Sequence, residues 1–170
     1  IQYEHQGVLK SYDCDQVIST LPLTLTGKLL GIDIPLSYQK VDAVYLLIDR
    51  PEAGPYHWVY FIDNDISIKR MVEFKHMSRF NTPTDTSVLC AEVTSEEPDP
   101  ISRVISDLVR SGYVQAEDVL DSMVVREDYA YPVYKVGYEK IVDDAFAKIK
   151  QTYGIHILGR GAEFIHREVD

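Results

Sequence analysis

The run VDAVYLLI at residues 41–48 decides the fold class, because it is rich in the β-branched and aromatic residues that favour strands. A second such run, YHWVYFI, covers residues 56–62, and the Pro- and Gly-containing segment at 50–55 predicts a turn between the two. We expect two more strands, over residues 67–76 and 87–94. Residues 39–95 therefore predict a meander of antiparallel strands.

The expected strand at 67–76 carries a charge among apolar residues. Alternate side chains of a strand point to the same face, so Ile68, Val72 and Phe74 are expected on one face with Arg70 among them. A charged group on an apolar face needs an ionic partner or an anionic ligand. Arg70 is therefore either a structural ion-pair residue or a ligand-binding residue.

Helices are expected on the C-terminal side of these strands. Apolar residues recur at helical spacing over 100–111 and again over 138–153, and Asp99 and Pro100 are typical of a helix start. A short helix is also expected after Pro22, and short strands within residues 1–20. The sequence thus predicts an α+β fold, with a mixed, largely antiparallel sheet and two or three helices packed on it, in a single domain over residues 1–170.

The composition excludes several kinds of partner. The 170 residues carry a net charge of −10, which would repel nucleic acid. No apolar run approaches the ~20 residues that cross a bilayer, so we expect no membrane span. The two cysteines, Cys14 and Cys90, are too few for a disulfide scaffold, which favours reduced thiols in a cytoplasmic protein.

The sequence offers few groups that could carry chemistry. It has no phosphate-binding glycine loop, and its five histidines are scattered without the spacing of metal ligands, so no metal site is predicted. Gly159, Arg160 and Gly161 follow a short expected strand. Glycine lets a backbone approach a ligand closely, and arginine binds phosphate. A tight turn with a surface arginine is the alternative interpretation.

Several short motifs resemble, in the same order, those of the flavin-containing amine oxidases and protoporphyrinogen oxidase-like proteins, a superfamily that includes the UDP-galactopyranose mutases. DQVISTLP at 15–22 resembles their D-x-V-I-S-T-x-P segment, and RMVEFK at 70–75 is similar to the mutase R-x-x-E-x-K strand. Tyr131–Pro132 resembles the Y-P pair before their last helix. Gly159–Arg160 resembles the segment that returns to the flavin, although His166 stands where a tyrosine is usual.

This resemblance implies that the chain is the substrate-binding domain of a larger FAD-dependent oxidoreductase. The superfamily's FAD-binding domain is split along the sequence, so residues 1–22 and 155–170 would be partial pieces of it, and its glycine-rich half would be a missing partner. Arg70 and Tyr131 would bind a small-molecule substrate, and no catalytic residue is identified. The residues expected to contact FAD are Ser19, Thr20, Leu21, Gly159 and Arg160.

Three functions are open at this point. The first is a fragment of a FAD-dependent oxidoreductase of the amine oxidase or protoporphyrinogen oxidase type. The second is a fragment of a UDP-galactopyranose mutase-like sugar-nucleotide enzyme, and the third is a non-enzymatic α+β binding module.

The resemblance also sets expectations for the isolated chain. It opens at Ile1 within an expected strand, as a segment of a longer protein would. Alone it should be inactive and carry no FAD, and surface left by a missing domain would favour a homodimer. Arg70 should then be partly exposed or held by Glu73 or Glu92.

Overall fold

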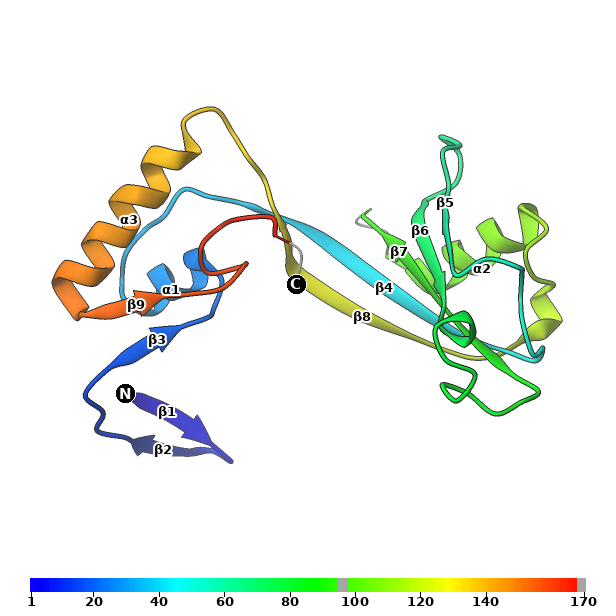
Figure 1. Ribbon diagram of the computed structural model, residues 1–170, viewed down its shortest axis with the longest axis horizontal. Coiled ribbons are helices and arrows are strands. Elements are labelled where there is room, and N and C mark those ends of the chain that lie inside the picture. The colour runs from blue at the N-terminus through cyan, green and yellow to red at the C-terminus, as the bar shows by residue number, and fades with distance from the viewer. Residues whose placement is uncertain (95–97, 168–170) are drawn as a thin grey trace. The chain divides into compact units, whose positions relative to one another are not determined.

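The computed structural model describes residues 1–94 and 98–167. The chain divides into two compact units (Figure 1). The first unit combines both ends of the chain, Ile1–Tyr38 and Tyr131–Asp170, and the second is Gln39–Ala130. Both end segments that the resemblance assigns to a FAD-binding domain therefore lie in the first unit.

The second unit is built on a five-stranded antiparallel sheet with the strand order β5-β6-β7-β4-β8. β5, β6 and β7 form the expected meander, but β4 pairs with β7 instead of with β5. The segment at 50–55 is therefore a connection across the sheet and not a hairpin turn, which corrects the expectation of a simple meander. The strands are β4 (Tyr38–Ile48), β5 (Trp58–Tyr60), β6 (Ile68–Glu73), β7 (Ser87–Val93) and β8 (Val119–Pro132).

A bulge in β6 changes the faces of that strand. Ile68 is opposite Val93 and Arg70 is opposite Glu92, so β6 uses one more residue than β7 over this step. Ile68 consequently packs in the core with Met71. The alternation that placed Ile68 with Arg70 is wrong at this point, and the strand ends at Glu73 because Phe74–His76 form a 3₁₀ turn, η1.

One face of this sheet is covered by helix α2 (Pro100–Arg110). Asp99 caps it as expected, because its side chain accepts a hydrogen bond from the backbone N–H of Ser102 at 3.1 Å. Val104 and Leu108 of α2 are buried against Leu46, Ile68 and other strand residues. A 3₁₀ turn, η2 (Ala116–Asp118), leads from this region into β8.

As far as residue 167, the first unit contains two helices and two small sheets. β1 (Gln2–His5) and β2 (Val8–Ser11) form an antiparallel hairpin, and β3 (Val17–Ser19) pairs in parallel with β9 (Ile155–Ile157). Figure 1 shows β3 and β9 side by side although they are far apart in sequence. The helices are α1 (Leu23–Leu29) and α3 (Tyr138–Tyr153), and Leu23 and Ile149 are fully buried in a shared core.

The elements of both units together confirm a mixed α+β fold, with three helices among the described residues. The helices expected at 100–111 and 138–153 are α2 and α3. None of the helices in the described part of the chain is long and apolar enough to cross a membrane.

Candidate functional site

The first candidate region lies where the parallel strands β3 and β9 end. The backbone N–H of Leu158 donates to the carbonyl oxygen of Ser19 at 3.1 Å, which brings Gly159 beside the end of β3. The Ser19 hydroxyl is hydrogen-bonded to the Thr26 hydroxyl at 2.8 Å. Ser19, Thr20 and Leu21 therefore run from the strand directly into α1, next to the loop that begins at Gly159.

Loop 159–166 turns back on itself and is fixed to α1. Gly159 has a φ of +100°, and the Glu163 N–H donates to its carbonyl oxygen at 2.8 Å. The Gly161 carbonyl oxygen accepts hydrogen bonds from the Tyr38 hydroxyl at 2.7 Å and the Leu23 N–H at 3.3 Å. Residues 163 and 164 thus form part of a turn. The final residues, 168–170, lie outside the described part of the chain.

Arg160 connects this loop to Tyr131. Its guanidinium carbon lies over the Tyr131 ring, 5.2 Å from the centroid, and its Nη2 is 3.2 Å from Nδ1 of His166. The Tyr131 and His166 rings are 5.5 Å apart. Tyr131 and the five residues expected to contact FAD are therefore brought together within the first unit. Sequence reasoning noted His166 only as a departure from the family motif.

Arg70 lies in the second unit, on the face of the sheet that α2 does not cover. In register across the strands, Tyr60, Arg70, Glu92 and Ala43 form one row. The next row is Trp58, Val72, Cys90 and Tyr45. We call these two rows the second face of the sheet.

Glu92 holds Arg70, as expected from the sequence. The Arg70 Nη2 donates to a carboxylate oxygen of Glu92, and the side chains are 27% and 20% exposed. Glu73, the other expected partner, points to the opposite face, where its carboxylate accepts hydrogen bonds from the N–H groups of Ala53 at 2.7 Å and Gly54 at 3.1 Å. Glu73 therefore anchors the 50–55 connection.

Two aromatic residues of β5, Trp58 and Tyr60, lie beside Arg70. Its guanidinium carbon is 5.2 Å from the centroid of the Trp58 ring, and the Trp58 and Tyr60 rings are 6.5 Å apart with an interplanar angle of 60°. Sequence reasoning did not name Trp58 and Tyr60 as candidate site residues. Their positions two apart in the 56–62 strand could have identified them as neighbours on one face.

The row next to Arg70 contains two side chains that can ionise, Cys90 and Tyr45, and both are neutral at neutral pH. Burial raises the pKa of the Cys90 thiol, so the thiol stays protonated at neutral pH. The neighbouring Cys90 and burial both raise the pKa of Tyr45. Tyr45 also stacks on Phe74 with ring centroids 6.2 Å apart. The side chains of this row are therefore uncharged at neutral pH, next to the Arg70–Glu92 ion pair.

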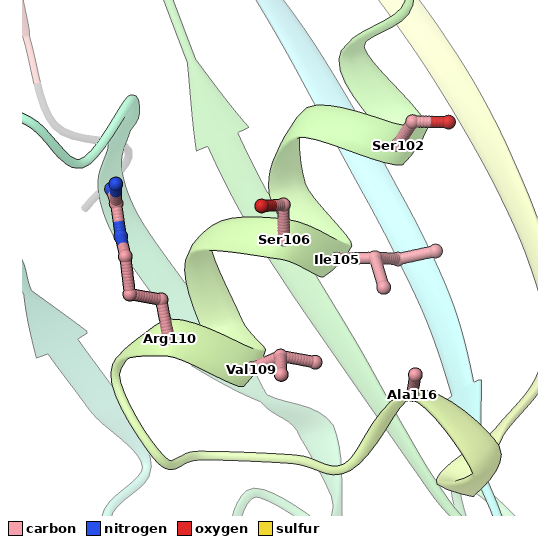
Figure 2. Close-up of a pocket in the computed structure, with 6 residues that line it drawn as sticks. All are labelled: Ser102, Ile105, Ser106, Val109, Arg110 and Ala116. Carbon is pink, nitrogen blue, oxygen red and sulfur yellow. The ribbon is translucent and has the colours of Figure 1, made fainter.

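The second unit has one cavity at its sheet and another along α2. One, of about 300 Å³, is lined by residues that include Tyr45, Leu47, Val88 and Met123. The other, of about 470 Å³, lies along α2 (Figure 2), where Ile105 and Val109 point toward Ala116 while Arg110 extends away. Arg110 is bound to Asp107 at 2.9 Å, so the second cavity offers little beyond aliphatic carbon and two serine hydroxyls.

The described residues contain no cluster of three or more His, Cys, Asp or Glu side chains that could hold a metal ion. A scan of protein-family models and a search of curated proteins give no match to the chain.

Solved structures do match. Reduced UDP-galactopyranose mutase superposes on 93% of this chain with a TM-score of 0.71 and 22% sequence identity. A protein assigned as a protoporphyrinogen oxidase from Exiguobacterium sp. 255-15 covers 94% with a TM-score of 0.70 and 19% identity. A double mutant of putrescine oxidase, redesigned in cofactor binding, covers 85% with a TM-score of 0.53 and 17% identity.

The expected resemblance to this superfamily is thereby confirmed at the level of the fold. The chain spans 38%, 40% and 36% of the lengths of these three proteins.

Proposed function

We propose that this chain supplies the substrate-binding part of a larger FAD-dependent oxidoreductase, and that its two end segments contribute part of the FAD site. The agreement in fold with an oxidase and a mutase over 93–94% of the chain carries this proposal. Ser19, Thr20, Leu21, Gly159 and Arg160 would contact FAD, and Tyr131 and Arg70 would border the substrate.

The geometry at the ends of β3 and β9 fits a diphosphate-containing cofactor. A Cβ placed on Gly159 would have no heavy atom within 4 Å, so a ligand can approach this backbone closely. Arg160 supplies a cation with a planar fork, which suits a phosphate group. When bound, FAD would supply the redox chemistry, namely hydride removal from a C–N or C–C bond.

The chain's own residues would position the reactants. Arg160 would be held in place by the Tyr131 ring and by His166, because both contact its guanidinium. The remaining cofactor contacts would come from a glycine-rich strand–turn–helix in the missing FAD-binding domain, because the diphosphate normally rests at such a helix N-terminus. This chain alone is accordingly proposed to bind no FAD and to be inactive.

The test is to express the longer protein from the source gene and to record its visible spectrum. We expect flavin absorbance near stoichiometric level, and we expect Arg160→Ala to lower flavin affinity by about tenfold or more. Lys140→Ala is a matched control, because Lys140 pairs with Asp144 on the exposed surface of α3. A longer protein purified without flavin, which also fails to take it up, would contradict the proposal.

A second candidate is a sugar-nucleotide mutase, because a reduced UDP-galactopyranose mutase is among the matching structures. Analysis of the reaction products formed by the flavin-loaded longer protein distinguishes an oxidoreductase from a mutase. An oxidoreductase consumes an electron acceptor with each turnover, whereas a mutase isomerises its substrate without net oxidation. A longer protein that lacks flavin and binds a ligand without turnover would instead support a binding module.

A further inference from the structure

The exposed rings on the second face are the starting point. Trp58 is 46% exposed and Tyr60 is 63% exposed, and both lie on β5, the strand at one edge of the five-stranded sheet. Large exposed aromatic residues that gather on one surface mark binding sites. The pairing of β5 with β6 places both residues beside Arg70, since Trp58 is in register with Val72 and Tyr60 is in register with Arg70.

The positive charge beside these rings is already neutralised. The Arg70 guanidinium is paired with the Glu92 carboxylate, and both groups are largely buried. A diphosphate that approached Arg70 would have to displace Glu92 or accept its repulsion at short range. Lys75, five residues further along the chain, is held by the 82–86 loop, because its Nζ lies 3.0 Å from the Thr82 hydroxyl and 2.8 Å from the Thr86 carbonyl oxygen.

The adjacent row has no ionised side chain, and the carboxylate of Asp121 lies beyond it, beside Tyr45 at the cavity of about 300 Å³. Val72 and Cys90 lie between Trp58 and Tyr45 in the adjacent row, and the Cys90 thiol is buried. One side of the Trp58 ring is occupied by Arg70. The guanidinium thereby fixes the ring's orientation, as a cation stacked on an indole does.

We propose that Trp58 and Tyr60 accept a flat, uncharged ring of the substrate, and that the Arg70–Glu92 pair positions Trp58 and disfavours diphosphates. This inference rests on the proposed function, since it names the substrate class for the substrate-binding part. It assigns Arg70 a positioning role instead of a direct contact with a substrate anion. It also favours oxidation of an uncharged ring compound over the isomerisation of a sugar nucleotide.

The single tryptophan makes the proposal directly testable. The chain has one tryptophan, so its indole N–H gives one resolvable proton resonance in an NMR spectrum. The chain is titrated with coumarin, a flat uncharged probe, and separately with inorganic pyrophosphate. We expect coumarin to shift the Trp58 indole resonance saturably and pyrophosphate to leave it unchanged. A saturable shift with pyrophosphate, or no saturable shift with coumarin, would overturn the proposal.

Two variants test the residues individually. Tyr60→Ala should weaken coumarin binding about fivefold, whereas Tyr3→Ala, an exposed tyrosine of the first unit, should leave it unchanged. Glu92→Gln keeps the shape of the side chain but releases the charge of Arg70, and should create a saturable pyrophosphate shift that the unaltered chain lacks. Should Glu92→Gln fail to fold, the two titrations of the unaltered chain still decide.

The outcome is independent of the proposed function's own test. If the longer protein contains flavin and pyrophosphate shifts the Trp58 resonance, the uncharged-ring substrate is rejected and the FAD-dependent enzyme is supported. If the chain binds coumarin and the longer protein contains no flavin, the binding site at Trp58 and Tyr60 is supported and the FAD-dependent enzyme is rejected.

Discussion

At the scale of single residues, Gly159 is where the candidate cofactor loop depends on glycine. Its φ of +100° lies in the region that residues with a Cβ rarely adopt. Gly159→Ala should therefore lower the free energy of unfolding by about 1–2 kcal/mol, measured by urea denaturation. The strain is in the backbone, because the space around a Cβ at this position is open.

Gly161 provides the control within the same loop. A Cβ there would meet only Pro22 atoms at 3.9 Å, which is ordinary van der Waals contact, and its φ is not positive. Gly161→Ala should change the free energy of unfolding by less than about 0.5 kcal/mol. Equal losses in the two variants would show that loop 159–166 adopts a different backbone.

Asp107 is a buried carboxylate whose protonation should control stability. It is 1% exposed and accepts hydrogen bonds from the Ser67 N–H at 2.7 Å and the Ser67 hydroxyl at 2.6 Å. Burial acts to raise the pKa of Asp107, but the Ser67 hydrogen bonds and the Arg103 charge outweigh it, so the pKa is lowered. The ionised form is therefore favoured by folding.

The sign of the pH dependence follows from this lowered pKa. The stabilisation is fully present above the unfolded-state value of 3.8 and is lost as pH falls through the lower folded-state value. Asp107→Asn should cost about 2 kcal/mol at neutral pH, and the difference from the unaltered chain should shrink in acid. Urea denaturation at several pH values in the acid range measures this difference in the free energy of unfolding. The control is Asp144→Asn, which removes one partner of an exposed ion pair and should cost under ~0.5 kcal/mol. A loss independent of pH would contradict the assignment.

At the scale of elements, α2 presents one buried side to the sheet and one side to the cavity of Figure 2. Leu108 is 0% exposed, and Leu108→Ala should cost about 3 kcal/mol because it leaves a cavity in the core. Ile105 only partly packs on the core, so Ile105→Ala should cost about 1 kcal/mol. Thermal or urea denaturation of both variants gives the comparison, and similar losses would mean that α2 is rotated.

Strand β6 shows why an element's faces are harder to predict than its position. The sequence located the strand but extended it three residues too far, and strict alternation then placed Ile68 on the face of Arg70. The bulge between Ile68 and Arg70 moved Ile68 into the core beside Met71. A bulge depends on how the neighbouring strand pairs, and that information is not local to the β6 sequence.

At the scale of the whole molecule, the second unit has a core of its own. Its buried cluster draws on residues from Val44 to Val114, all within Gln39–Ala130. Residues 39–130 expressed alone should therefore unfold cooperatively in urea. Leu108→Ala should destabilise this fragment and the complete chain by the same amount. A fragment without a cooperative transition would show that its core needs the first unit.

The sequence by itself determined the α+β class, helices α2 and α3, the Asp99 cap and the strand positions, because periodicity and capping are local properties. Its motifs also indicated the superfamily fold, and they left Glu73 and Glu92 open as partners of Arg70. Tertiary structure alone decided that β4 pairs with β7, that β3 and β9 bring Ser19 beside Gly159, and that Arg70 lies over Trp58. These contacts join residues distant in the chain, and they are selected by packing and hydrogen bonding over the whole fold, which no local pattern encodes.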